Sequence, residues 1–169
     1  MQESDDELRK YLEELHKIEV EKENLQIAER ERQDQIDKKL LKEKTETAIK
    51  SFERFKIAVE KMCNMVPATD TLKIVFKESS DIKPDDRSGR RTDEVRVSYR
   101  GSAKAEIEYW RIYKDSPAVM KWSRSVGDSL QDWKCLADGR WEPLKGGAGE
   151  YPETVAKKFV TMVMQLPAH

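Results

Sequence analysis

The stretch EVRVSYRGSAKAEIEYW, residues 94–110, consists of two alternating segments on either side of one glycine. Every second position of each segment is apolar or aromatic: Val95, Val97, Tyr99, Ala105, Ile107 and Tyr109. A period of two places these side chains on one face of a strand and the intervening side chains on the other. The pattern predicts two antiparallel strands that have one buried face and one solvent-exposed face.

The two strands are expected to form a hairpin, because residues 101–103 can provide a three-residue turn that begins with glycine. This turn sets Val97 opposite Ile107 on the buried face and Arg96 opposite Glu108 on the exposed face. A turn one residue shorter would bring charged side chains to the buried face, so the pattern restricts the register of the hairpin.

Further strands are predicted on both sides of the hairpin. Residues 72–77 alternate in the same way, and shorter strands are expected over 119–125 and 133–143. The last of these turns at residues 137–139, which end in the Asp-Gly pair that is typical of tight turns. Residues 78–92 are polar and are predicted to form a mobile loop.

A helix that begins at Pro152 is expected to cover the sheet. Its apolar residues fall on one stripe: Val155, Phe159, Met162, Val163 and Leu166. Residues 145–150, KGGAGE, predict a glycine-rich hinge and not a phosphate-binding loop, because Glu150 stands where phosphates would require a positive neighbour. Residues 67–169 therefore predict a small α+β globular head that contains an antiparallel sheet and a covering C-terminal helix.

Residues 1–66 contain neither proline nor glycine and are rich in Glu, Lys, Gln, Arg and Leu. This composition predicts one continuous helix, roughly 90 Å long at about 1.5 Å per residue. Pro67 ends it.

Apolar residues recur along this helix at alternating spacings of three and four, which predicts a coiled coil over residues 1–66. Two runs differ in phase by two residues, and the polar residues 26–39 between them predict a skip or a weak middle. The predicted oligomerisation residues are Leu8, Tyr11, Leu15, Ile18 and Leu25 in the first run and Leu41, Ala48, Phe52, Phe55, Val59 and Met62 in the second.

The apolar set widens near the end of the helix to include Ile49, Ile57, Ala58, Cys63 and Met65. A stripe this broad meets more than one neighbour, so the last turns are expected to pack on the sheet or to join a bundle.

The distribution of charge bears on the partner of the helix. Residues 1–29 hold ten acidic and four basic residues, whereas residues 30–66 hold seven acidic and ten basic residues. In a parallel pair of identical helices Glu14 would face Glu19, and the two carboxylates would repel. An antiparallel copy or a different, complementary chain is therefore favoured as the partner.

The sequence contains little that resembles a catalytic or metal site. The two histidines, His16 and His169, are far apart, and Cys63 and Cys135 lack the spacing of zinc or redox motifs. We expect no enzyme activity, no metal and no cofactor. The isolated cysteines, the polar N-terminal segment without a signal peptide and the absence of a long apolar run predict an intracellular protein, cytoplasmic or nuclear, with no membrane association.

The predicted partner-binding group lies on the exposed face of the hairpin. Alternation places Trp110 there beside Arg96, Glu106 and Glu108, and tryptophan and arginine often dominate binding interfaces. The alternative is that Trp110 is a core residue that packs under the loop over residues 78–92. We expect a non-enzymatic oligomerising adaptor, in which the coiled coil binds itself or a cognate chain and the head binds a protein. In the order of its parts the chain is similar to kinetochore proteins that carry C-terminal RWD-type heads.

The alternative hypothesis is a coiled-coil protein that binds nucleic acid. Each of the four tryptophans adjoins a lysine or an arginine, and such pairs can stack on single-stranded nucleic acid. The net charge of −1 for the whole chain disfavours this alternative, because nucleic-acid affinity comes mainly from positive charge.

Overall fold

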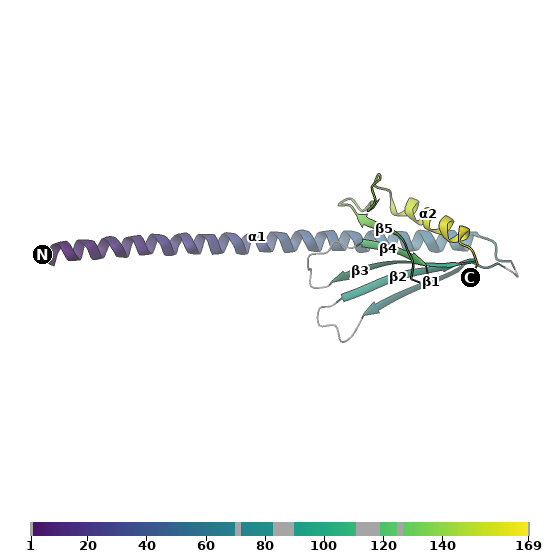
Figure 1. The fold of residues 1–169 in the computed structure, drawn as a ribbon, viewed down its shortest axis with the longest axis horizontal. Coiled ribbons are helices and arrows are strands. Elements are labelled where there is room, and N and C mark those ends of the chain that lie inside the picture. The colour runs from purple at the N-terminus through teal and green to yellow at the C-terminus, as the bar shows by residue number, and fades with distance from the viewer. Residues whose placement is uncertain (1, 70–71, 83–89, 111–118, 125–126, 169) are drawn as a thin grey trace. The chain divides into compact units, whose positions relative to one another are not determined.

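The computed structural model describes residues 2–69, 72–82, 90–110, 119–124 and 127–168, except the side chains of Asp81, Ile82, Arg90 and Trp110 (Figure 1). These residues form the α+β fold that the sequence predicts: a long N-terminal helix, a six-stranded antiparallel sheet and a C-terminal helix. The elements are α1 (Gln2–Met65), β1 (Val75–Ile82), β2 (Arg90–Ser98), β3 (Ser102–Trp110), β4 (Val119–Arg124), β5 (Ser129–Cys135), β6 (Trp141–Pro143) and α2 (Pro152–Gln165).

The chain divides into two compact units, one that ends at Leu40 and one that spans Leu41–His169. The boundary between the units falls inside α1. The sequence predicted the boundary between residues 66 and 67 instead. The two boundaries differ because residues 41–65 pack against the sheet, as described below. Each unit is described by itself.

The six strands pair in the order of the sequence, from β1 to β6, and every pair is antiparallel. The β2–β3 hairpin exists, but its predicted register is wrong by four positions: Val97 lies opposite Ala103 and Arg96 opposite Lys104. The turn consists of residues 99–101, so glycine ends the turn and does not begin it. Because a shift of four is even, the buried and exposed faces are still the predicted ones.

Packing against the residues that follow α2 explains why glycine occupies the last position of this turn. A Cβ atom on Gly101 would lie 2.7 Å from the backbone oxygen of Pro167 and 2.9 Å from Cβ of Leu166. Only a residue without a side chain allows this approach, so the turn is fixed where the end of the chain covers it.

The predicted mobile loop over residues 78–92 is wrong in part. Residues 78–82 belong to β1 and pair with residues 91–95 of β2, and residues 90–92 belong to β2; residues 83–89 lie outside the described residues. β1 is the edge strand of the sheet, and its residues from Glu78 to Ser80 are exposed. An edge strand with such side chains has no apolar alternation, which is why composition predicted a loop.

The predictions for the remaining strands are confirmed in part. The strand expected over 72–77 begins only at Val75, as β1. β4 covers residues 119–124 of the strand expected over 119–125, and residue 125 lies outside the described residues. β5 and β6 form the hairpin expected over 133–143, although β5 begins earlier, at Ser129. Gly139 adopts the left-handed backbone conformation (φ 86°) in the predicted turn, and the Leu136 amide donates a hydrogen bond to the Arg140 carbonyl across it.

The core lies between one face of the sheet and two helices, α2 and residues 41–65 of α1 (Figure 1). Phe55 of α1 lies 5.6 Å from Phe159 of α2, and Phe159 lies 5.1 Å from Trp122 of β4, measured between ring centroids. The buried sheet residues are Val95, Val97, Ala103, Ala105, Ile107, Tyr109, Met120, Trp122, Trp133 and Trp141. The two helices thus cover the face that the alternation pattern assigns to the core.

The second heptad run of α1 is part of this core, which corrects its interpretation as an intermolecular seam. Phe52, Phe55 and Val59 are fully buried and Ala48 is 1% exposed, all within the chain itself. Leu41 and Met62, at either end of the run, are half-buried. A sheet needs a helix with an apolar stripe to cover it, and this requirement produces the same three-and-four spacing as a coiled coil.

The prediction that the last turns of α1 pack on the sheet is confirmed for Ala58 and Cys63, which are buried, and for Ile49, which packs against the core. The prediction is wrong for Ile57 and Met65 in this chain, because their side chains are 58% and 68% exposed.

The glycine-rich segment 145–150 reverses the chain between β6 and α2. Backbone hydrogen bonds hold both of its ends: the Gly146 amide donates to the Pro143 carbonyl, and Glu150 pairs with Trp141 in an isolated bridge. Lys158 binds the Glu150 carboxylate at 2.5 and 2.7 Å. Whether the segment acts as a hinge stays a prediction.

Candidate interaction surfaces

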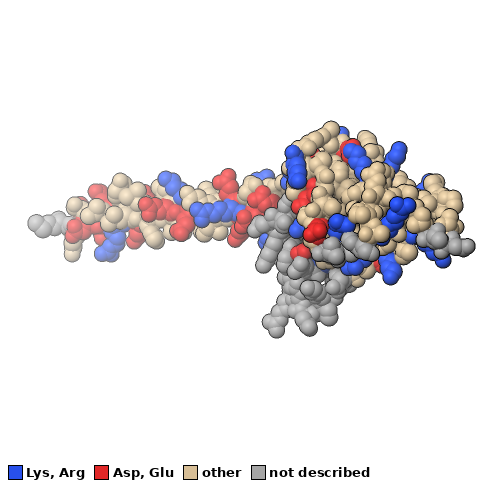
Figure 2. Space-filling model, turned by 45° about the vertical axis from the view of Figure 1, so that its right-hand side comes forward, with Lys and Arg blue, Asp and Glu red and all other residues tan. Residues whose placement is uncertain are grey.

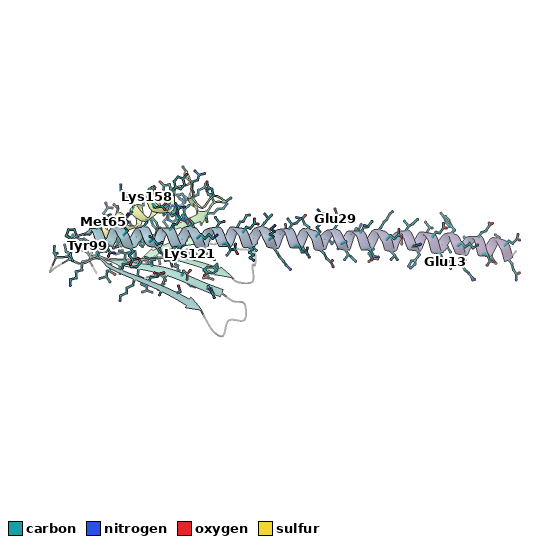
Figure 3. All side chains as sticks on the ribbon, turned by 180° about the vertical axis from the view of Figure 1, so that it is seen from behind. Glu13, Glu29, Met65, Tyr99, Lys121 and Lys158 are labelled. Atoms are coloured by element: carbon teal, nitrogen blue, oxygen red, sulfur yellow. The ribbon has the colours of Figure 1, made fainter. Side chains whose placement is uncertain are left out.

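The first heptad run forms an apolar stripe on residues 2–40 of α1. We call it the N-terminal stripe, and its members are Leu8, Tyr11, Leu15, Ile18 and Leu25. Their exposed fractions range from 42% for Leu15 to 70% for Leu25. Side chains project around the whole circumference of this part of the helix, on which Glu13 and Glu29 are labelled in Figure 3. Within the described part of its unit, no second element covers the stripe.

Charged residues separate the N-terminal stripe from the opposite side of the helix, and acidic side chains are prominent along this part of the chain (Figure 2). Two apolar residues, Val20 and Ile27, lie on that opposite side and are 40% and 46% exposed. They are isolated among charged neighbours, whereas the members of the stripe follow one another along a single face.

The second candidate surface is the outer face of the sheet, the side that bears neither helix. We define the outer face by Lys77, Ser79, Glu94, Arg96, Lys104, Glu106 and Lys121. The strand register places like charges side by side: Arg96 lies between Lys77 and Lys104, and Glu94 lies opposite Glu106. Like charges in directly opposed positions destabilise a sheet.

Contacts along each strand offset this repulsion. Nε of Arg96 lies 3.1 Å from Oε1 of Glu94, and Nζ of Lys104 lies 3.3 Å from Oε2 of Glu106. The hydroxyl of Ser79 donates a hydrogen bond of 2.9 Å to the same oxygen of Glu94. The result is a row of bases beside a row of acids, which gives this face a charge pattern that a complementary surface can match.

Glu94 is the most enclosed charged group of these rows, with a side chain that is 19% exposed. Burial by itself raises the pKa of Glu94, but the hydrogen bonds from Ser79 and Arg96 and the charges of Arg96 and Lys104 outweigh burial. The pKa of Glu94 therefore lies below its usual value, and the carboxylate is ionised at neutral pH.

The predicted partner-binding residues do not form one compact group. Arg96, which is 52% exposed, contacts Glu94 and not the predicted Glu108, which lies opposite Thr92. Glu106 is half-buried on the same face as Arg96. The backbone of Trp110 pairs with that of Arg90, six positions along β3 from the residue opposite Arg96, or about 20 Å at about 3.3 Å per residue. The Trp110 side chain lies outside the described residues.

Sequence reasoning missed Lys56, a lysine whose side chain is only 6% exposed. Its Nζ lies 2.5 Å from Oε1 of Glu78 on β1 and 2.8 Å from Oε2 of Glu53 on α1. It also lies 5.9 Å from the centroid of the Phe52 ring. Its position in the sequence could have indicated burial, because Lys56 comes four residues after Phe52 and three before Val59, on the apolar side of the helix.

Burial by itself lowers the pKa of Lys56, but hydrogen bonds to Glu53 and Glu78 and the charges of both carboxylates raise it above its ordinary value. Lys56 is therefore protonated at neutral pH, and its bond to Glu78 fastens α1 to the edge strand. This role is structural.

Neither cysteine has the environment of a nucleophile. Burial raises the pKa of both thiols to about 11, with a further contribution from Glu60 for Cys63 and from Asp138 for Cys135. Both thiols are thus protonated at neutral pH, whereas nucleophilic cysteines have a lowered pKa. Among the described residues, no group of three His, Cys, Asp or Glu side chains lies close enough to hold a metal ion.

Three of the four tryptophans are core residues: Trp122, Trp133 and Trp141 are at most 4% exposed. Their rings cannot stack on nucleic acid without unfolding the sheet. The basic neighbours of Trp122 and Trp133, Lys121 and Lys134, lie on the opposite face of their strands, as strand alternation requires, and are exposed. The pairs at Trp122 and Trp133 are therefore explained by strand alternation.

Comparison with known proteins gives no relative: no family model, no curated protein sequence and no solved structure matches this chain. In the described residues, no helix combines the length and the apolar character that crossing a membrane requires.

Proposed function

We propose that this protein is a non-enzymatic oligomerising adaptor. In this proposal residues 2–40 of α1 associate with a helix of another chain or of a second copy, and the unit from Leu41 onward binds a protein partner. The observation that carries the proposal is the exposure of the N-terminal stripe. Five large apolar side chains in line along one helix face, each at least 42% exposed, are typical of a helix that associates with another.

The proposal predicts association that depends on the stripe. Leu15→Asp with Leu25→Asp places two carboxylates in the stripe, and Val20→Asp with Ile27→Asp places two on the opposite side of the same helix. Sedimentation velocity at tens of micromolar, with the chain alone and with synthetic helical peptides that carry Leu and Ile in a heptad seam, measures association. We expect the first variant to lose it and the second to retain it. A chain that stays monomeric in every mixture would contradict the proposal.

The outer face is the proposed docking surface of the second unit. Its rows of charge support binding to a protein with complementary rows, since electrostatic complementarity selects partners and sets register. Arg96→Glu with Lys104→Glu reverses the basic row, and Lys61→Glu with Lys157→Glu makes the same change in charge on the two helices. A partner that docks on the outer face is lost from affinity capture with the first variant and retained with the second. Equal loss from both would remove this part of the proposal.

The nucleic-acid alternative has no supporting observation, because the tryptophans that motivated it are buried, apart from Trp110, whose side chain is not described. Enzyme activity and the cellular compartment stay predictions from the sequence.

A further inference from the structure

The N-terminal stripe is bordered by carboxylates on both sides. With Leu8, Leu15 and Lys22 at heptad position a and Tyr11, Ile18 and Leu25 at position d, the positions beside the stripe are e and g. The e positions hold Asp5, Leu12, Glu19 and Gln26, and the g positions hold Glu7, Glu14, Glu21 and Ala28. Five of these eight border positions are thus acidic and none is basic.

The basic residues of this segment lie elsewhere on the helix. Arg9, Lys10 and Lys17 occupy the outward positions b and c, away from any partner that covers the stripe. In the described part of the chain, no ion pair involves any of the five border carboxylates. Their charges therefore face whatever packs on the stripe.

A parallel copy of this helix does not fit such a border. Parallel coiled coils bring g of one helix against the following e of the other, which sets Glu14 against Glu19 twice in each dimer. Repulsion between like charges across a seam opposes this pairing.

An antiparallel copy fits no better. Antiparallel pairing matches a with d and g with g, and one register joins all five apolar residues: Leu8 with Leu25, Leu15 with Ile18, and Tyr11 with Lys22. In this register Glu14 lies near Glu21 of the copy, and no basic residue lies at the border. The more basic half of α1 cannot compensate, because its apolar face, including Phe52, Phe55 and Val59, is buried against the sheet.

We propose that the N-terminal stripe pairs with a helix of a different polypeptide, one whose heptad seam is bordered by lysine or arginine at e and g. This inference rests on the proposed function, since it names the partner of the association surface described there. Complementary borders set partner choice in coiled coils. Lys22 adds a requirement within the seam, because a charged residue at an a position favours a polar or acidic residue opposite it and fixes the register.

The test uses the full chain and two synthetic peptides with the same Leu and Ile seam, one with lysine and one with glutamate at every e and g position. Binding is measured at low salt and at about 1 M salt, where the Debye length falls to about 3 Å. We expect the lysine peptide to bind at least about 30-fold more tightly at low salt, because several attractive border pairs add up in its complex and the same positions repel in the complex with the glutamate peptide. At 1 M salt the difference narrows to a few-fold. The chain alone stays monomeric in sedimentation at tens of micromolar.

Two variants separate the border from the general charge of the helix. Glu7→Lys, Glu14→Lys and Glu21→Lys together reverse the border and are expected to reverse the preference between the peptides. Glu3→Lys, Glu13→Lys and Glu23→Lys make the same change in net charge at outward positions, and this variant is expected to keep the preference for the lysine peptide.

The outcomes distinguish this inference from the function on which it rests. Self-association of the chain through the stripe, or equal affinity for the two peptides, overturns the inference and leaves the adaptor proposal standing. A monomeric chain that binds neither peptide overturns both. Equal responses of the two charge-reversal variants also overturn the inference, because the preference would then come from net charge and not from the border.

Discussion

Two stretches of the same helix, residues 2–40 and residues 41–65 of α1, have the same spacing of apolar residues but differ in burial. Leu15 in the first is 42% exposed, whereas Phe55 in the second is fully buried among residues of its own chain. Spacing alone shows that a helix has an apolar face and does not show what covers it.

Residue size and the width of the stripe distinguish the two stretches. The second stretch combines Phe52 and Phe55 with the small Thr45, Ala48 and Ser51, all buried, and large and small side chains together let a helix lie closely on a sheet. The first stretch has Leu, Ile and Tyr with charges at its borders, which is typical of a seam between helices. These features separate a core helix from a coiled coil where the three-and-four spacing does not.

Backbone hydrogen exchange gives the largest expected difference between the two stretches. Amides within residues 45–63 are expected to exchange about 1,000-fold more slowly than exposed amides or slower still, because their opening requires loss of the core. Amides within residues 5–35 of the monomeric chain open by local fraying, and we expect protection of about tenfold or less there. Mass spectrometry resolves both regions in one experiment. Strong protection of both stretches in a monomer would show that they do not differ in this way.

Truncation of one apolar side chain in each stretch measures this difference as a change in the free energy of unfolding. Phe55→Ala removes a ring that contacts Phe52 and Phe159, and we expect a loss of about 3–5 kcal/mol in the free energy of unfolding. Leu15→Ala is expected to change it by less than about 0.5 kcal/mol. Urea denaturation followed by tryptophan fluorescence reports on the core for both. A small effect of Phe55→Ala would place this side chain outside the core.

The counter-charges of the buried Lys56 are expected to contribute to the stability of the second stretch. Glu53→Gln with Glu78→Gln leaves Lys56 buried without a counter-charge and is expected to cost about 2 kcal/mol. Lys56→Met is expected to stay within about 1 kcal/mol of the unmodified chain, because it keeps the packing and leaves two carboxylates that are 55% and 46% exposed. Equal losses from both changes would show that the ion pairs, and not burial of the lysine, dominate.

The pH dependence of stability follows from the raised pKa of Lys56. The contribution of this group is fully present below its ordinary pKa of 10.5 and decreases as pH rises through the higher pKa of the folded state. The unmodified chain is therefore expected to lose stability above about pH 10.5 more steeply than Lys56→Met does. Thermal unfolding of the two chains across pH 8 to 11 checks this sign.

A single hydrogen bond gives the smallest expected effect. The hydroxyl of Ser51 donates a bond of 2.5 Å to the carbonyl of Gly139, which joins α1 to the β5–β6 turn. Ser51→Ala leaves that buried carbonyl without this donor, and we expect a loss of about 1 kcal/mol in urea denaturation. No measurable loss would mean that solvent replaces the hydroxyl at this turn.

The sequence predicts the faces of the strands better than their register. Val95, Val97, Ala105 and Ile107 lie on the buried face as expected, but the predicted Arg96–Glu108 pair does not form, since Arg96 lies opposite Lys104. Alternation repeats every two residues, so a hairpin shifted by an even number keeps every apolar side chain inside. The position of Gly101 is decided by its contact with residues 166 and 167, which no local pattern contains.

The candidate surfaces were predictable to different degrees. The N-terminal stripe follows from heptad spacing, because nothing else in its unit competes for it. The predicted group around Trp110 does not, because its four members were joined by face alone, and a face of a strand extends over about 20 Å between residues 104 and 110. Lys56 was missed because a lysine is ordinarily assigned to the surface.

The pairing of α1 with α2 has a consequence for synthesis of the chain. Arg54 and Glu153, which bond these helices at 2.9 Å, are 99 residues apart, whereas every strand pairs with the next strand in the sequence. At about 5–20 residues per second, Phe52 and Phe55 leave the ribosome about 5–20 s before the helix that closes over them. During that interval the side of these aromatic residues that α2 covers is open to chaperones, and any message truncated before the codons of α2 yields a product in which this side of the core lacks its covering helix.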